Sequence, residues 1–274
     1  MDNMPKVTIV TICYNIVTEV ELTIKSIIDQ TYPNIEYLVI DGGSTDGTVD
    51  IIKKYQDNIT SWTSESDKGL YDAMNKGIER ATGEWIIFMN GGDSFFSNHA
   101  IADVIAKINY DTIIAYGRLM CYYPTFKFVY KDKPLDLSLL VKRSIMPHQA
   151  TFINVAYHKR HLYDCTLKSA SDYKFFHHAY LLDKVKFQFI SVIVTNFDNY
   201  GGISKSIKAI KEDEVSHLNG NWRSPIYRLK TYTAVFKLSI RNKLPIQIAM
   251  LYRRMHLALM GFKTYSLKDT SMNK

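Results

Sequence analysis

Four clusters of polar and glycine residues in the first hundred positions carry side chains suited to phosphate, sugar or metal chemistry. They are Tyr14-Asn15 and residues 41–47, 65–69 and 90–93. The last cluster, Asn90-Gly91-Gly92-Asp93, joins a carboxylate to two glycines, which let a bulky ligand approach the backbone. Asp93 is a hard oxygen ligand suited to Mg²⁺ or Mn²⁺, ions that neutralise charge on a diphosphate. A turn in which Asp93 caps the following segment fits the same residues.

The cluster at 41–47 carries Asp41 in a loop rich in turn residues, and the cluster at 65–69 adds two carboxylates and an ammonium. Asp41 could accept a hydrogen bond from a base or ribose, or its loop could be only a tight turn that caps the next helix. Lys68 could meet a phosphate and Asp67 a base or sugar, although a solvated loop explains the same residues. The glycine run is not a Walker A loop, because no Gly-Lys-Ser/Thr follows, and it lacks the GxGxxG spacing.

Candidates for acid–base chemistry lie in the second half of the chain. Asp172 stands at a predicted helix start, where it would either cap the helix or act as a general base. His148, with Gln149 beside it, is a secondary candidate, because a lone histidine has a structural role more often than a catalytic one. The pair His177-His178 has no neighbouring cysteine or acidic ligand pattern, so we interpret it as helix surface and core and not as a metal site.

The hydrophobic pattern predicts a framework that brings the four clusters together. Continuous β-branched or apolar runs predict buried strands, and apolar residues at helical spacing predict helices between them. The predicted strands are residues 7–12, 37–40, 59–63 and 84–89, and the predicted helices are residues 18–30, 48–55 and 71–81, the last with Gly83 as a C-cap. Such alternation forms a mostly parallel sheet with helices on both faces, and ligands bind beyond the carboxyl ends of its strands. We therefore expect the four clusters along one edge of the sheet.

The middle of the chain, about residues 101–198, has a mixed pattern. Three short strands of a smaller antiparallel piece are expected, then a helix and a further strand. The three strands are residues 113–116, 121–123 and 127–130, the helix is 171–182 and the last strand is 187–194.

The last part of the chain is basic and amphipathic. No acidic residue occurs between Glu214 and Asp269, while basic and aromatic residues are interleaved. Two helical faces are expected, one of Leu229, Tyr232 and Phe236, and one of Leu244, Ile248, Leu251, Tyr252, Met255 and Leu259 that begins near Pro245. Helices of this kind favour an anionic membrane interface, and a helical lid on the protein's own core is the alternative.

The composition, net charge and cysteine spacing limit the classes of protein to which this chain can belong. The 274 residues are 46% hydrophobic and 22% charged, so a globular fold is expected. The formal net charge of +7 favours anionic partners: nucleotides, nucleic acid or an acidic membrane surface. Cys13, Cys121 and Cys165 are far apart, which favours buried, reduced thiols. The apolar run near the N-terminus is too short for a signal peptide or a membrane span, so a cytoplasmic location is expected.

Taken in order, the motifs of the first hundred residues resemble family 2 glycosyltransferases. The opening strand and loop at 7–15, the stretch 30–36 and the run 39–48 resemble that family. Residues 66–77, Ser-Asp-Lys-Gly-Leu-Tyr-Asp-Ala-Met-Asn-Lys-Gly, match a branch that makes bacterial surface polysaccharides, and 81–85 and 90–93 complete the series. Residues 147–152 and 171–173 are similar to the acceptor half of the same branch, more loosely.

The resemblance implies a GT-A fold, which is a Rossmann-like, mostly parallel sheet flanked by helices, and an inverting mechanism. It implies that Thr11 and Asp41 contact the nucleoside with Asp67 beside them, that Asp93 binds the metal, and that Asp172 is the catalytic base. Asn90 replaces the first aspartate of the family's DxD motif, which weakens the case for tight metal dependence. The full set expected to bind the nucleotide and donor is Thr11, Tyr14, Asn15, Asp41, Asp67, Lys68, Asn75, Asn90, Gly91 and Gly92, with His148 and Gln149 as candidates near the acceptor.

The sequence thus predicts an enzyme in three parts. Residues 1–100 form the half that binds the nucleotide sugar, 101–205 the half with the acceptor and the base, and 206–274 the basic helical extension. The expected donor is a nucleoside-diphosphate sugar, UDP by family habit, and the expected acceptor is a saccharide, such as one linked to polyprenyl diphosphate. Residues 215–268 would hold the protein on the anionic inner face of the cytoplasmic membrane, and no nucleic-acid motif is found. The alternatives are a nucleotidyltransferase, disfavoured because residues 14–23 lack lysine and arginine, and an inactive partner subunit of a polysaccharide-assembly complex.

Overall fold

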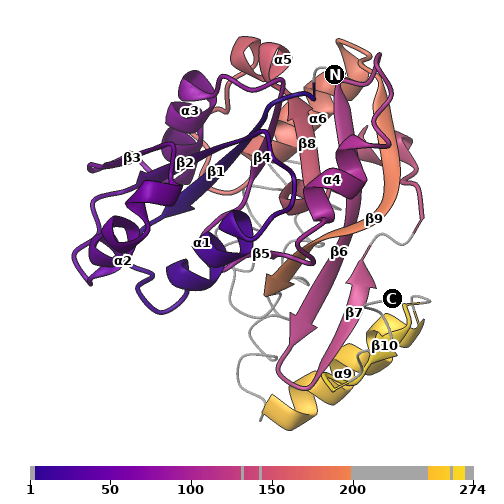
Figure 1. The fold of residues 1–274 in the computed structure, drawn as a ribbon. Helices are drawn as coiled ribbons and strands as arrows, with labels where there is room; N and C mark the ends of the chain where they lie inside the picture. Colours follow the sequence, from indigo (N-terminus) through magenta and orange to yellow (C-terminus); the bar gives the residue numbers. More distant parts are fainter. Residues whose placement is uncertain (1–3, 131–132, 142–143, 199–245, 260–261, 269–274) are drawn as a thin grey trace.

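The structure is a computed structural model that describes residues 4–130, 133–141, 144–198, 246–259 and 262–268 (Figure 1). These residues form one mixed sheet of ten strands, ordered β10-β7-β6-β8-β4-β1-β2-β3, with β9 paired to β6 and β5. The strands are β1 Val7–Cys13, β2 Ile35–Asp41, β3 Ser61–Ser64, β4 Trp85–Phe88, β5 Ser94–Phe95, β6 Ile114–Tyr123, β7 Phe126–Tyr130, β8 Thr151–Asn154, β9 Phe187–Asp198 and β10 Thr264–Tyr265.

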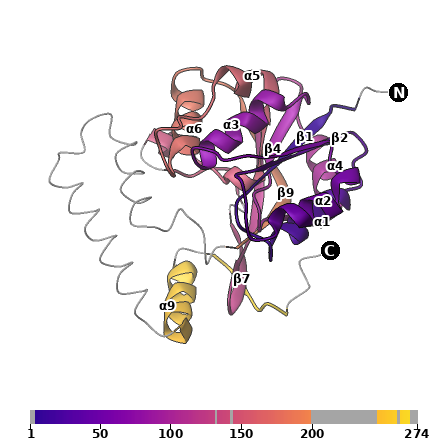
Figure 2. The same ribbon diagram turned by 90° about the vertical axis from the view of Figure 1, so that its left-hand side faces the viewer.

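Helices cover both faces of the sheet, as Figure 2 shows. The helices are α1 Val20–Ile28, α2 Thr48–Lys54, α3 Leu70–Arg80, α4 Ala100–Ile105, α5 Val155–Arg160, α6 Ser171–Leu181 and α9 Ile246–Leu259, with short 3-10 turns at Gln56–Asn58, Leu137–Val141 and His148–Ala150. Side chains alternate along the strands, so β1 directs Ile9 into a core with α1, α2 and α4 and Val10 into a second core with α3, α5 and α6.

The predicted parallel framework is confirmed. Strand β1 pairs in parallel with both β2 and β4, and β2 pairs in parallel with β3. Their carboxyl ends therefore point to one edge, and the polar clusters after β1, β2, β3 and β4 all begin there. The α/β fold class read from the sequence is correct.

The middle region differs from the expected separate antiparallel piece. The predicted strands at 113–116 and 121–123 fall in one long strand, β6, which begins at Ile114 and joins the same sheet as the N-terminal strands through β8. The pairing of β6 with β9 is parallel, and its register shifts around Arg118. A Cβ on Gly117 would lie 2.8 Å from the Val192 carbonyl oxygen, so glycine allows the two strands to approach there. The division of the GT-A domain at about residue 100 stays a prediction, because one sheet runs through both halves.

Gly83 does not act as the helix cap that we expected. Helix α3 ends at Arg80 with Ala81 as its C-cap. A Cβ on Gly83 would lie 2.7 Å from the Lys6 carbonyl oxygen and 2.9 Å from the Thr8 nitrogen. Glycine is therefore required for the close approach of this loop to β1.

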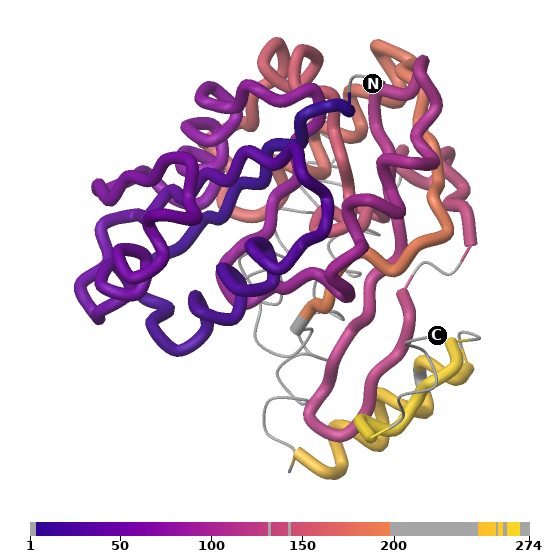
Figure 3. Tube along the Cα trace, viewed as in Figure 1, coloured from indigo at the N-terminus to yellow at the C-terminus, as the bar shows by residue number. Residues whose placement is uncertain are grey.

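Part of the predicted basic extension lies outside the described residues, including the face of Leu229, Tyr232 and Phe236. Helix α9 begins at Ile246, directly after Pro245, and lies beside the β6–β7 end of the sheet (Figures 1, 2 and 3). Strand β10 pairs with β7, Phe262 packs edge-on against Phe128, and the Arg253 side chain donates to the Tyr123 hydroxyl over 2.9 Å. Within the described ranges, no helix is long and apolar enough to cross a membrane.

Candidate active site

The loops that follow β1 and β2 are tied together at the carboxyl edge. Asn15 links them twice, because its backbone nitrogen donates to Ser44 Oγ over 2.8 Å and its Oδ1 accepts from the Thr45 nitrogen over 2.9 Å. Asn15 adopts a left-handed conformation with φ of 49°, which asparagine tolerates better than most residues. Asn15 therefore sets the shape of this edge.

Asp41 is the centre of the loop after β2. Its carboxylate is fully buried and accepts hydrogen bonds from the backbone nitrogens of Gly43 and Ser44 and from the hydroxyls of Ser44 and Ser64. A buried carboxylate needs such donors, and here they come from its own loop and from the end of β3. In this structure Asp41 holds the loop, and its contact with a nucleoside remains a prediction.

Two of the predicted donor-binding residues, Tyr14 and Asp67, meet at Gly42, the residue after Asp41. A Cβ on Gly42 would lie 2.5 Å from Asp67 Oδ2 and 3.3 Å from the Tyr14 ring, so the glycine lets both side chains approach the backbone. The Tyr14 ring is 62% exposed and is available for stacking. Asp67 Oδ1 accepts from the Gly69 nitrogen over 2.8 Å, which fixes the carboxylate, and the other oxygen faces Gly42. A flat aromatic surface beside a carboxylate is suited to binding a nucleoside base and ribose.

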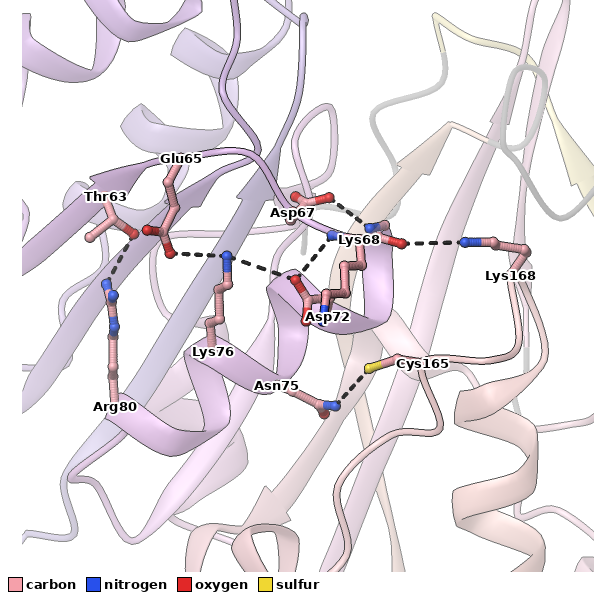
Figure 4. Close-up of polar contacts among 11 residues, drawn as sticks. Thr63, Glu65, Asp67, Lys68, Asp72, Asn75, Lys76, Arg80, Cys165 and Lys168 are labelled. Carbon is pink, nitrogen blue, oxygen red and sulfur yellow. Dashed lines mark hydrogen bonds and ion pairs between the residues drawn. The ribbon is translucent and has the colours of Figure 1, made fainter.

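The loop after β3 is fixed to α3 by the polar contacts drawn in Figure 4. Lys76 binds Glu65 at 2.9 Å and lies 3.8 Å from Asp72, whose carboxylate accepts from the Lys68 nitrogen over 3.0 Å. Lys168, from the second half of the chain, donates to the Lys68 carbonyl oxygen over 3.3 Å. The exposed Lys68 ammonium forms no salt bridge with any described residue, so it is a suitable cation for a phosphate.

Thr11 and Asn75 make hydrogen bonds inside the protein, and their predicted contacts with the donor remain predictions. The Thr11 hydroxyl is fully buried in β1 and lies 3.1 Å from the Tyr37 hydroxyl. The Asn75 side chain donates to the Tyr163 carbonyl oxygen and accepts from the Tyr163 nitrogen, each over 2.9 Å, and it also contacts Cys165. In this structure Thr11 is held within the sheet, and Asn75 ties α3 to the backbone at Tyr163.

Residues 90–93 form a tight turn after β4. Its backbone is bound to β1 through the Gly91 nitrogen and the Ile12 carbonyl oxygen at 3.0 Å, and Gly92 has φ of 96°, which favours glycine. The buried Thr23 hydroxyl of α1 accepts from the Gly92 nitrogen and donates to the Asp93 carbonyl oxygen. The proposed capping role of Asp93 is wrong, because β5 follows the turn and the next helix is capped at His99.

The side chains of this turn fit a divalent metal ion. The Asp93 carboxylate is 7% exposed, and Asn90 Oδ1 is buried without a hydrogen-bond partner among the described residues. A buried acceptor without a donor is costly, and an ion or ligand would satisfy it. An amide carbonyl and a carboxylate are hard oxygen ligands of the kind that Mg²⁺ and Mn²⁺ prefer.

Asp172 lies in the first turn of α6 but does not cap it, because Ala170 is the N-cap residue. Its Oδ1 accepts a hydrogen bond of 2.8 Å from the Tyr71 hydroxyl, which comes from the start of α3, directly after the Asp67–Gly69 loop. Burial, and then the Asp172 charge, raise the pKa of Tyr71, so this tyrosine is a neutral donor. Oδ2 has no hydrogen-bond partner in the described part of the chain, so it is suited to accepting a proton.

His148 belongs to a buried network rather than to an exposed acid–base pair. Its ring stacks on Phe88 at 5.5 Å, and its Nε2 lies 2.9 Å from the Tyr163 hydroxyl, which also lies 3.3 Å from His158 Nε2. Burial lowers the pKa of His148 and lowers that of His158 to about 3, so both rings are neutral. Neighbouring Gln149 accepts at its backbone carbonyl from Thr195. In this structure His148 is part of the core, and its predicted role near the acceptor remains a prediction.

Sequence reasoning missed Tyr71 and Thr23. Tyr71 lies within the motif at residues 66–77. Its contact with Asp172 joins residues 101 positions apart, so the local pattern around Tyr71 does not predict it. Thr23 is a polar residue among the apolar positions on the buried face of α1. This exception to the apolar pattern indicates a residue whose hydroxyl has a specific hydrogen-bonding role.

Comparisons with known proteins match this chain to glycosyltransferases. Residues 8–168 match the model of "Glycosyl transferase family 2". The chain is similar to a "PGL/p-HBAD biosynthesis glycosyltransferase" of Mycobacterium bovis BCG, at 29% identity over 74% of this chain and 80% of that protein. It is also similar to a "Putative teichuronic acid biosynthesis glycosyltransferase TuaG" of Bacillus subtilis, at 35% identity over 33% of this chain and 37% of that protein.

Solved structures share the fold. S. aureus TarS 1–349, in complex with UDP-GlcNAc, has a TM-score of 0.61 at 17% identity over 85% of this chain and 71% of that one. The Pyrobaculum calidifontis mannosyltransferase PcManGT, in complex with GDP-Man and Mn²⁺, has a TM-score of 0.60 at 17% identity over 94% of this chain and 81% of that one. The chain covers 42% of the longer TarS structure. The GT-A fold read from the sequence is thereby confirmed.

Proposed function

Because the chain belongs to glycosyl transferase family 2, we propose that it transfers a sugar from UDP to a hydroxyl of a saccharide, with inversion at the anomeric carbon. The observation that carries this proposal is the arrangement at the carboxyl edge. Tyr14 and Asp67 meet over Gly42, Asn90 and Asp93 offer oxygen ligands, and Asp172 is bound to the helix that follows the Asp67 loop. Nucleoside, diphosphate and acceptor thus each have side chains of suitable chemistry.

The proposed reaction is a single in-line displacement. The acceptor oxygen forms a bond to the anomeric carbon while the bond from that carbon to the diphosphate oxygen breaks, and the proton of the hydroxyl passes to Asp172. Tyr71 orients the Asp172 carboxylate by donating to Oδ1, which leaves Oδ2 for the proton. Lys68 is placed to bind a phosphate oxygen. A Mg²⁺ or Mn²⁺ ion held by Asp93 and Asn90 would neutralise charge on the leaving nucleoside diphosphate.

The acceptor that we propose is a surface saccharide under assembly on a lipid, such as a polyprenyl diphosphate. The names of the relatives support a role in surface glycoconjugates: one belongs to PGL/p-HBAD biosynthesis and another to teichuronic acid biosynthesis. Capsule, O-antigen and exopolysaccharide synthesis are the corresponding settings.

We propose that α9 holds the protein on the anionic inner face of the cytoplasmic membrane. Ala249, Met250 and Leu257 are its buried positions, whereas its opposite face exposes Ile248, Leu251, Tyr252, Met255 and Leu259. These are the described members of the face predicted from the sequence. Arg254, Lys263 and Lys268 lie on and next to the helix, so the apolar face has basic neighbours that suit an anionic lipid surface.

The proposal is tested by a transfer assay with labelled UDP-, GDP- and dTDP-sugars and a lipid extract as acceptor. We expect transfer from a UDP-sugar, and we expect Asp172→Asn to lower kcat by about a hundredfold to ten-thousandfold while UDP still binds. Asp111→Asn is the matched control, because Asp111 is paired with Lys186. Wild-type rates in Asp172→Asn would overturn the role of the base, and failure with every donor would favour the inactive-partner alternative.

A further inference from the structure

Two histidines and an aspartate meet at the ends of α5 and α6. His161 Nε2 lies 3.1 Å from Asp183 Oδ2, and His178 Nε2 lies 3.4 Å from Asp183 Oδ1. The three ligand atoms lie within 4.8 Å of one another. His161 is the C-cap of α5, His178 is in the last turn of α6, and Asp183 follows that helix, so the cluster joins two elements that lie side by side in Figures 1 and 2.

A hydrogen bond to the backbone orients the His161 ring with its Nε2 toward the carboxylate. His161 Nδ1 lies 3.0 Å from the Tyr157 carbonyl oxygen, which can only accept, so Nδ1 carries the proton. In the neutral His161 ring, Nε2 then carries a lone pair and no proton, and it faces a carboxylate oxygen of Asp183. Two acceptors at that distance repel each other unless a cation lies between them, either a proton or a metal ion. A backbone carbonyl on the far nitrogen is also the usual support of a histidine that binds a metal.

The surroundings add negative character. The C-terminal end of a helix carries partial negative charge, and Asp183 adds a carboxylate at the end of α6. Lys184 turns the chain with φ of 51°, an uncommon conformation for lysine, and the Asp183 nitrogen donates to the His178 carbonyl oxygen over 3.3 Å. The buried Tyr157 hydroxyl donates to Asp183 Oδ2 over 2.7 Å and fixes the carboxylate. The hydrogen bonds from Tyr157 and from the backbone thus hold the His161 and Asp183 side chains in place.

We infer that His161, His178 and Asp183 bind a divalent transition-metal ion of the zinc class. This differs from the interpretation of His178 from the sequence, because the fold brings His161 from α5 next to it. Two imidazoles with one carboxylate suit Zn²⁺ better than Mg²⁺ or Mn²⁺, because imidazole is a softer ligand than oxygen. Ligand bonds of about 2.0–2.1 Å to tetrahedral zinc place neighbouring ligand atoms about 3.3–3.4 Å apart, close to the two nitrogen–oxygen distances observed. The side chains are partly exposed, so a solvent molecule can complete the coordination.

The ion would link the end of α5 to the end of α6 and so stabilise the acceptor half. It closes the segment from His161 to Asp183, which contains both Tyr163, bound by Asn75, and Asp172. The site is separate from Asp93, uses different ligands and selects a different class of metal. Its existence therefore does not depend on the proposed transfer reaction.

The test uses the full chain without a histidine tag, stripped of metal and titrated with Zn²⁺ and with Co²⁺. We expect one zinc ion per chain, visible d–d absorption from Co²⁺ with imidazole ligands, and a Tm that rises by roughly 5 to 10 °C when free zinc is about a hundredfold above its Kd. His178→Gln and Asp183→Asn should remove the absorption and most of the rise in Tm. His177→Gln is the matched control, because His177 lies on the same helix against Tyr173.

Asp93→Ala separates this site from the proposed active site, and it should bind zinc and Co²⁺ as the wild type does. Circular dichroism of each metal-free variant establishes that it is folded. The inference is overturned if the wild type gives no Co²⁺ absorption, or if zinc raises the Tm of His178→Gln and Asp183→Asn as much as that of the wild type. Either result would identify the cluster as histidine–carboxylate ion pairs that need only a proton.

Discussion

At the scale of single residues, the pair Tyr71–Asp172 connects the two halves of the proposed active site. The hydroxyl comes from α3, next to the donor-side loop, and the carboxylate comes from α6. Hydrogen bonds to charged groups contribute about 1.5–3 kcal/mol, and a base acts only where its carboxylate is held in position. Tyr71 is therefore expected to be a positioning residue for catalysis.

Tyr71→Phe tests this role. Because the base keeps its charge but loses its orientation, we expect kcat to fall by about tenfold to a hundredfold with little change in KM for the donor. Steady-state kinetics with the preferred nucleotide sugar measure both constants. Tyr55→Phe, which removes a tyrosine–carboxylate contact between the C-cap of α2 and Glu21 of α1, should leave kcat unchanged. Equal rates for Tyr71→Phe and wild type would contradict the role of Tyr71.

His148 and His158 make the stability of the fold dependent on pH. Burial holds the pKa of His158 at about 3 in the folded chain, against 6.5 for an ordinary histidine, and it also lowers the pKa of His148. Below pH 6.5 the unfolded chain therefore binds more protons than the folded chain, so the free energy of unfolding falls as the pH falls. The loss from His158 alone between pH 7 and pH 5 is roughly 2 kcal/mol.

Urea unfolding at pH 7, 6 and 5 measures this dependence. His158→Gln should be less stable than wild type at pH 7 but should lose less stability on acidification, because one proton-binding difference is gone. His99→Gln is the control, since His99 is exposed and contacts Thr31. A slope in His158→Gln as steep as that of the wild type would show that His158 is not held neutral.

Several residues of the site could be predicted from the sequence, because their motifs are local. Asp67, Gly42 and Tyr14 follow strands of a parallel sheet, so their common edge was predictable, and the structure brings them together. The side-chain partners of Thr11 and Asn75 were not predictable, since each bonds to a residue from another element. Residue type and spacing indicate the edge on which a side chain lies, and packing decides whether it faces a ligand.

At the scale of elements, the placement of α3 on β1 depends on Gly77. A Cβ at this position would lie 2.5 Å from Val10 Cγ1, and Val10 is fully buried and stiff at χ1. Helix α3 carries Tyr71 at its start and Asn75 in its middle, so its depth on the sheet sets both positions.

Gly77→Ala is expected to destabilise the fold. Overpacking costs about 1–3 kcal/mol, which outweighs the gain of about 1 kcal/mol in helix propensity. Val10→Ala should also destabilise, through a cavity, but the double variant should be more stable than the sum of the two changes predicts, because the new methyl group fills that cavity. Urea unfolding of the four proteins measures the coupling. Strict additivity would contradict close packing between α3 and β1.

The elements themselves were unequally predictable. The β-branched runs of β1 and β2 gave a clear strand signal, and α1, α2 and α3 were found within a few residues of their observed bounds. Strand β6 was read as two pieces and its parallel pairing with β9 was missed, because that pairing joins residues about seventy positions apart and is not encoded locally. The strands β5 and β10 have two residues each, too few for any period.

At the scale of the whole molecule, the exposed face of α9 is the structural basis for the membrane attachment that we propose. Leu251 is 62% and Met255 60% exposed, and both lie opposite the positions that pack on the sheet. An apolar face of this kind, next to basic residues, is typical of helices that lie in a membrane interface.

Vesicle co-sedimentation tests this attachment. We expect binding to vesicles that contain phosphatidylglycerol at low salt, weaker binding at high salt, and little binding to neutral vesicles. Leu251→Glu with Met255→Glu should abolish the binding, whereas Leu22→Glu, at a 58% exposed leucine of α1, should not. Absence of binding to anionic vesicles at low salt would favour a contact of this face within the protein itself.

The central claim, that the carboxyl edge binds a nucleoside diphosphate with a metal on Asp93, is tested most directly by calorimetry. UDP is titrated with and without Mn²⁺ into the wild type, Asp93→Ala and the control Asp111→Ala. We predict that Mn²⁺ tightens binding to the wild type and to the control by at least about tenfold, or 1.4 kcal/mol, and that Asp93→Ala loses this gain. UDP binding that is the same with and without Mn²⁺, and unchanged in Asp93→Ala, would contradict the claim.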